Sequence, residues 1–89
     1  MTIPLGSRVR WSHDGVVHDG CVVQGIPAGQ LPTVPASVAR HRRRFICEAS
    51  DVDRVLVRVE TTTRGSFYYA PHAEGVTVVP VRVRRMARA

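Results

Sequence analysis

The sequence predicts an all-β fold made of short strands. Sixteen of its 89 residues are valine, and most of them stand in runs where apolar and polar residues alternate. β-Branched side chains pack well on a pleated sheet and lose rotamer freedom in a helix. Glycine, proline and Asp-Gly pairs separate these runs, which is typical of turns. We therefore expect one domain over residues 1–89, because a chain this short has room for a single core.

A strand followed by a tight turn is expected near the start of the chain. Residues 7–13 alternate, with Val9 and Trp11 on one side and arginine or serine on the other. The Asp14-Gly15 pair that follows tolerates positive φ at both positions, so it predicts a two-residue hairpin turn. Gly20 is expected to form a bulge or bend that leads into the next strand.

Residues 27–44 interrupt the strand pattern. Three prolines and a glycine between residues 27 and 35 exclude a long strand, so this segment is expected to be a Pro/Arg-rich loop insertion. Its second half permits a short helix with Thr33 as the N-cap.

The second half of the chain returns to strands. They are expected at residues 45–48, 54–60, 66–70 and 76–80. In the clearest of them the valines face inward, whereas Arg54, Arg58 and Glu60 face water. A tight or 3₁₀ turn is expected at 71–75, and a basic tail at the end of the chain, flexible over residues 84–89.

Several short motifs resemble SH3-like small barrels, in particular KOW-like and Tudor-like modules. They are Gly6-x-x-Val9-x-Trp11, Gly15, Gly20-x-Val22, Val55-x-Val57 and Tyr69-x-Pro-His-x-Glu-Gly-Val-x-Val-Val79. The resemblance implies a small five-stranded barrel that works by binding a partner.

Enzymatic chemistry finds little support in the residues. The type II dihydrofolate reductases are barrels of similar size, but their Val-Gln-Ile-Tyr strand is Val76-Thr-Val-Val79 in this chain. No nucleophile, base and orienting group can be assigned together, and no phosphate loop or dinucleotide fingerprint is present. We expect no enzymatic activity and no cofactor.

A metal site is also not expected. His13, Asp14, His18 and Asp19 lie close together in sequence, but turn formation explains both Asp-Gly pairs and no further ligand has suitable spacing. The two cysteines, Cys21 and Cys47, are too few for a disulfide scaffold and are expected to be buried thiols.

No segment predicts membrane insertion or export. The first residues lack a charged region followed by an apolar run, and no stretch approaches the roughly 18 apolar residues of a membrane span. A cytoplasmic protein with no membrane partner is the expectation.

The five aromatic residues allow two interpretations. In one, Trp11, Phe45, Phe67 and Tyr69 fill the core of a valine-rich barrel. In the other, an aromatic side chain forms a stacking platform for nucleic-acid bases. Because Tyr68 should face away from Phe67 and Tyr69, it is the candidate stacking residue.

The chain is strongly basic. All thirteen basic residues are arginine, against seven carboxylates, giving a formal charge of +6. A GC-rich genome would explain arginine in place of lysine, but the excess charge still predicts attraction to a polyanion.

Twelve of these thirteen arginines fall into three groups. They are Arg40, Arg42, Arg43 and Arg44; Arg82, Arg84, Arg85 and Arg88; and, on outward strand faces, Arg8, Arg10, Arg54 and Arg58. One interpretation is solvated surface charge without a binding role. The other is that the groups merge into one positive face that contacts the phosphates of DNA or RNA.

We take a non-enzymatic nucleic-acid-binding module as the leading hypothesis. Two alternatives remain open. One is a protein adaptor that docks on an acidic partner, and the other is a homo-oligomeric structural component.

Overall fold

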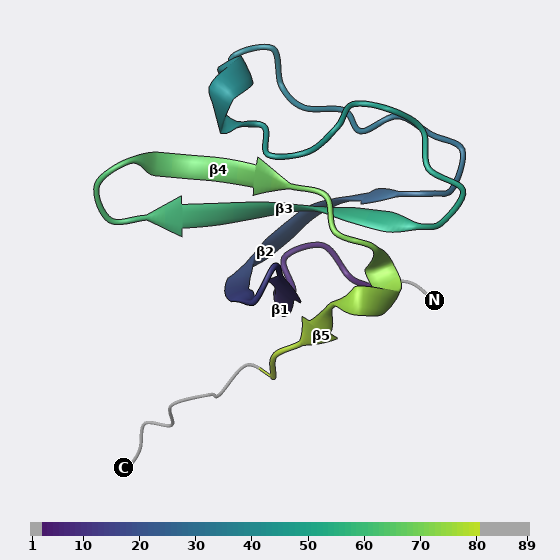
Figure 1. Cartoon of the computed structure of the whole chain (residues 1–89), viewed down its shortest axis with the longest axis horizontal. Coiled ribbons are helices and arrows are strands. Elements are labelled where there is room, and N and C mark those ends of the chain that lie inside the picture. Colours follow the sequence, from purple (N-terminus) through teal and green to yellow (C-terminus); the bar gives the residue numbers. More distant parts are fainter. Residues whose placement is uncertain (1–2, 81–89) are drawn as a thin grey trace.

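The computed structural model describes residues 3–80, which form a single five-stranded antiparallel sheet (Figure 1). The strands are β1 (Arg8–His13), β2 (Val16–Ile26), β3 (Arg54–Thr61), β4 (Gly65–Tyr69) and β5 (Thr77–Val78). Their order is β4-β3-β2-β1-β5, and the only helical elements of residues 3–80 are two 3₁₀ turns, η1 (Arg40–Arg42) and η2 (Ala73–Gly75). The all-β prediction is confirmed. The arrangement is consistent with a small SH3-like barrel, although β4 and β5 do not pair and the sheet stays open.

The hairpin between β1 and β2 forms as predicted. Asp14 and Gly15 have φ angles of 52° and 78°, the positive values that a tight two-residue turn needs. The register places His13 opposite Val16 and Trp11 opposite His18. Because side chains of directly opposed residues lie on the same face, this register brings an indole and an imidazole together.

Strand β2 pairs with β1 through its first half and with β3 through its second half. The predicted bulge at Gly20 was wrong, because the register shift lies between Val22 and Gln24. Gly20 has a different role: a Cβ atom there would lie 2.4 Å from the carbonyl oxygen of Arg58. Glycine at this position therefore allows two backbones to approach closely.

Strand β3 is buried on both of its faces at its start. Val55 and Val57 join Val9, Trp11 and Val22 in the core, while Leu56 on the other face is also buried. The prediction that Arg54 faces water was wrong, since this side chain is only 8% exposed. Its guanidinium donates hydrogen bonds to the carbonyl oxygens of Gln30 and Glu48, which belong to the long loop between β2 and β3.

That long loop, residues 27–53, contains no strand and only the 3₁₀ turn η1. The strand expected at 45–48 was therefore wrong. No helix begins at Thr33, and the short helical element in the second half of the insertion is η1. Contacts near the two ends of the loop hold it, with the Gly29 amide donating to Ser50 O at 2.7 Å and the Ala28 amide to Asp53 Oδ1 at 2.9 Å. These two hydrogen bonds, one to a backbone carbonyl and one to a side-chain carboxylate, hold the base of the loop in place of the regular structure that its prolines exclude.

The outer edge of β4 is partly covered by residues 42–44 of the same loop. The Arg44 amide donates to the Tyr68 carbonyl at 2.7 Å, and the Arg42 guanidinium donates to the carbonyls of Arg64 and Ser66. An uncovered edge strand presents unpaired backbone groups that invite pairing with another chain. Two of the predicted phosphate-binding arginines thus belong to the segment that closes this edge.

The cysteines differ from one another in exposure. Both are free thiols, with Cys21 half-buried and Cys47 exposed. The prediction of two buried thiols was wrong for Cys47, because the segment that carries it is a surface loop rather than a strand. Within residues 3–80, no helix has the length and apolar character to cross a membrane.

Candidate nucleic-acid interface

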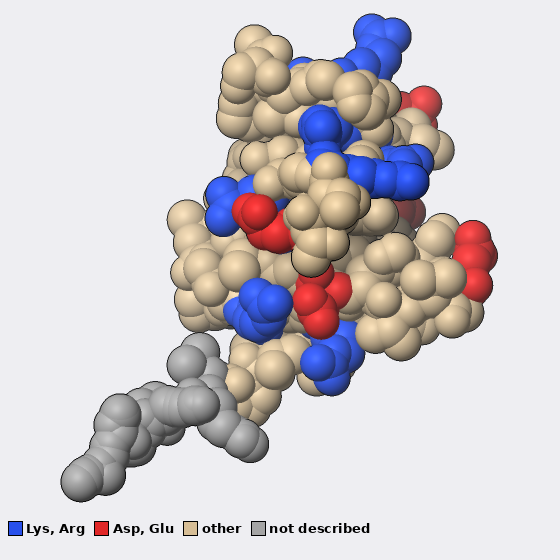
Figure 2. Space-filling view, turned by 90° about the vertical axis from the view of Figure 1, so that its left-hand side faces the viewer, with Lys and Arg blue, Asp and Glu red and all other residues tan. Residues whose placement is uncertain are grey.

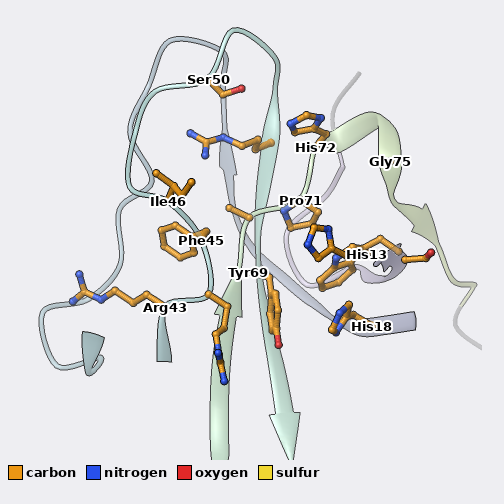
Figure 3. A pocket seen from close by; sticks show the side chains of 15 residues that line it. His13, His18, Arg43, Phe45, Ile46, Ser50, Tyr69, Pro71, His72 and Gly75 are labelled. Carbon is orange, nitrogen blue, oxygen red and sulfur yellow. The ribbon is translucent and has the colours of Figure 1, made fainter. Parts of the chain in front are cut away.

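An open groove of about 1020 Å³ runs between the long loop and the sheet (Figure 3). Fifteen residues from β1, β2, β3, β4, the 43–50 segment and the approach to β5 line it: Trp11, Ser12, His13, His18, Arg43, Arg44, Phe45, Ile46, Ser50, Arg54, Tyr69, Ala70, Pro71, His72 and Gly75. They include three arginines, three histidines and three aromatic residues, but none of the seven carboxylates of the chain. The groove is therefore positively charged and rich in flat rings.

Three rings form a contiguous cluster in one part of the groove. The ring centroids of Trp11 and His18 are 5.4 Å apart and stacked, and Tyr69 lies 5.6 Å from Trp11 and 5.0 Å from His18. Trp11 is 8% exposed and belongs to the core, whereas His18 and Tyr69 are half-buried. The accessible ring surface of this cluster therefore comes from His18 and Tyr69.

Phe45 and Ile46 lie on the opposite side of the groove from His13 and His18 (Figure 3). Phe45 is half-buried, and Ile46 is 72% exposed. The groove thus has an aromatic residue on each wall. The alternating pattern of the sequence did not predict either wall of the groove, because the residues of each wall come from segments far apart in the chain.

Two of the predicted phosphate-binding residues line the groove, namely Arg43 and Arg44. Arg44 is exposed, with its guanidinium carbon 5.1 Å from the Phe67 ring centroid. Arg43 is half-buried and donates to the Val38 carbonyl at 2.9 Å. Arg44 is the better placed of the two to meet an anion from solvent.

Other predicted residues of the first arginine group lie outside the lining. Arg40 is exposed on η1. Arg42 is held within the fold by its bonds to β4 and by a cation–π contact of 5.1 Å with Phe67. Tyr68 is half-buried and sits opposite Arg58 in the β3–β4 register, so it faces away from Tyr69 and the groove, and its neighbour Tyr69 lines the groove instead.

The outward-facing arginines of β1 and β3 lie close to carboxylates. Arg8 and Arg10 approach Asp19 at 3.5 and 4.0 Å, and Arg58 forms an ion pair of 3.1 Å with Glu60. In the face shown in Figure 2, the basic side chains lie at separate places with acidic side chains between them. On this face, then, the arginines do not merge into the continuous positive surface that one of the two interpretations of the sequence expects.

The predicted contacts of Arg82, Arg84 and Arg85, and the predicted tail at 84–89, lie outside the described residues. The charge of that segment is still fixed by composition. Residues 1–80 contain nine arginines and seven carboxylates, a net charge of +2, so residues 81–89 supply the other four positive charges.

The histidine and aspartate pairs around the first hairpin do not gather into a ligand set. His13 Nε2 lies 3.3 Å from Asp14 Oδ2 in an exposed pair, while His18 turns to the aromatic cluster. Within the described part of the chain, no group of three or more His, Cys, Asp or Glu side chains is placed to hold a metal ion.

Comparisons with protein-family models, curated proteins and solved structures found no match to this chain.

Proposed function

We propose that this domain is a non-enzymatic module that binds single-stranded DNA or RNA in the groove. The observation that carries the proposal is the composition of the lining, with three arginines, three histidines, Trp11, Phe45 and Tyr69, and no carboxylate. Nucleic acid presents the matching chemistry, since it combines anionic phosphates with flat bases.

Stacking would supply the attraction for bases. Proteins that bind single strands combine a positive groove with rings on which bases stack, each stacked base contributing about 1–3 kcal/mol. His18 and Tyr69 are half-buried in the groove and offer such surface. Duplex bases are already stacked on one another, so the proposal favours single strands.

Arginine would supply the attraction for phosphates. Arg44 lies exposed on the groove, and Arg40 is exposed on the adjacent turn η1. The four arginines of residues 81–89 would add attraction that does not depend on base sequence. Arg8 and Arg10 share Asp19, which lowers their expected contribution.

Fluorescence anisotropy with a labelled single-stranded oligonucleotide tests the proposal. We expect binding that weakens steeply between 50 and 200 mM salt, as counterion release requires. Arg44→Ala should weaken binding clearly, whereas Arg58→Ala, which removes an exposed arginine away from the groove, should change it little. Equal effects of the two substitutions, or no binding at low salt, would reject the groove as the site.

An acidic protein partner is the second candidate, and one observation favours it. Ile46 is 72% exposed on the groove wall next to Phe45, so the groove also offers apolar contact to an acidic peptide. Capture from lysate with and without nuclease separates the two functions. A partner protein that survives nuclease treatment would favour the adaptor, and loss of all bound material would favour nucleic acid. A mass well above 9.8 kDa without any partner would instead favour self-assembly.

A further inference from the structure

Arg54 carries a buried positive charge that no carboxylate of residues 3–80 pairs with. The side chain is 8% exposed, and its Nε atom is buried and lacks a hydrogen-bond partner within the described residues. One terminal nitrogen, Nη2, donates to the Glu48 carbonyl at 2.6 Å and to the Gln30 carbonyl at 3.4 Å. These neutral acceptors satisfy only part of the guanidinium.

Burying the charge of Arg54 without an ionic partner lowers the stability of the fold. Buried arginines are normally paired, because removing an unpaired charge from water costs several kcal/mol. Glu48, Asp51 and Asp53 lie within six residues of Arg54 in sequence, yet all three are exposed and none forms a salt bridge with it. None of these three nearby carboxylates therefore neutralises the charge of Arg54 at this part of the groove.

Two further polar groups lie at the same end of the groove. Ser50 and His72 face one another there (Figure 3), and His72 is joined to Arg54 by a backbone bridge. The Ser50 hydroxyl oxygen accepts a hydrogen bond from the Val52 amide, which leaves its own O–H free to donate to a ligand. The His72 imidazole is exposed and also carries a donor.

We propose that Arg54, Ser50 and His72 form a phosphate-binding subsite at this end of the groove. Arg54 supplies the charge, and the hydroxyl and imidazole supply neutral donors, the combination that a phosphate group accepts well. This inference rests on the proposed function for its nucleic-acid ligand. It places a phosphate beside Arg54 and a base at the Trp11–His18–Tyr69 cluster, which lies further along the groove.

Thermal unfolding in inorganic phosphate tests the subsite directly. At matched ionic strength, phosphate should raise the Tm of the wild-type protein relative to chloride, because a ligand that binds only the folded state stabilises it. Arg54→Met should remove this response, while Arg58→Met, the control at an exposed arginine, should retain it. Because Arg54 also ties the loop to β3, the Ser50→Ala/His72→Ala double variant provides a test that leaves this tie intact. It should bind phosphate about tenfold more weakly, a loss of about 1.4 kcal/mol.

The same variants distinguish the ligand sources. Binding of inorganic phosphate and of a mononucleotide, but not of an oligonucleotide, would support the subsite and reject the proposed function. Oligonucleotide binding that neither Arg54→Met nor the double variant weakens would reject the subsite and leave the proposed function standing. A wild-type Tm that is equal in phosphate and chloride would also reject the subsite. Arg54 would then serve only to hold the long loop to β3.

Discussion

Trp11 and His18 are direct partners across the β1–β2 hairpin, and their rings stack with centroids 5.4 Å apart and planes 26° from parallel. The Asp14-Gly15 turn sets this register, so local turn chemistry positions an imidazole on an indole at the groove wall. One face of the stack belongs to the core and the other to the groove. The hairpin therefore both stabilises the core, through Trp11, and places the His18 ring in the candidate site.

His18→Ala should weaken oligonucleotide binding while costing little stability. The imidazole contributes a cross-strand contact with Trp11, worth up to about 1 kcal/mol, and a tilted ring contact with Tyr69, but also part of the accessible ring surface of the groove. His41→Ala is the matched control, because His41 is exposed and lies outside the lining. Anisotropy titrations and urea unfolding of both variants check the prediction. Unchanged affinity in His18→Ala would argue against stacking at this cluster.

Gly20→Ala should destabilise the fold by about 1–3 kcal/mol, the usual cost of forcing extra volume into a packed site. The new methyl group would meet Arg58 O at 2.4 Å and Val57 Cγ1 at 2.8 Å. Gly25→Ala, in the same strand, has no atom within 4 Å of the added carbon and should be neutral or slightly stabilising. Denaturant midpoints give both values, and similar midpoints for the two variants would contradict the close approach of β2 and β3.

Arg42→Ala should lower the free energy of unfolding by about 1.5–3 kcal/mol, because it removes charge-assisted hydrogen bonds to the edge of β4 and a cation–π contact with Phe67. Arg40→Ala should stay within about 0.5 kcal/mol, as expected of an exposed side chain. Thermal and urea unfolding measure the difference. If Arg42→Ala is as stable as Arg40→Ala and loses oligonucleotide affinity, Arg42 contacts phosphate as the sequence predicts.

A chain shortened to residues 1–80 should bind oligonucleotides less tightly and with a smaller salt dependence. The deletion removes four arginines and lowers the net charge from +6 to +2. If all four contact phosphates, the slope of log K against log salt should fall by up to about 3 units for a single strand. An unchanged slope would show that none of the four, Arg82, Arg84, Arg85 and Arg88, takes part.

Local rules predicted much of the fold. Alternation of apolar and polar residues located β1 and β3, and the Asp14-Gly15 pair located the hairpin, because each depends on residues adjacent in sequence. The bulge in β2 was expected at Gly20 but the register shift lies between Val22 and Gln24, since a glycine serves a bulge and a close backbone approach equally well. The short run at 45–48 resembles a strand in its sequence, but it lies in the long loop and pairs with no strand of the sheet.

The candidate site was harder to predict than the fold. Groove residues such as Trp11, Phe45 and Tyr69 come from three distant segments, and only tertiary packing brings them together. Arg54 follows the outward phase of a strand by alternation, yet the long loop covers that face and buries it. The number of arginines gives the net charge of the chain, but it does not show which guanidinium groups form hydrogen bonds within the fold.

Amide chemical-shift mapping during titration with a single-stranded oligonucleotide is the most direct test of the groove as the binding site. The account predicts that the largest shifts fall on the lining residues, including the Trp11 indole, His18, Phe45 and Tyr69. It also predicts small shifts around Glu60, where the exposed Arg58 is already paired. Shifts concentrated at that ion pair, with the groove unperturbed, would contradict it.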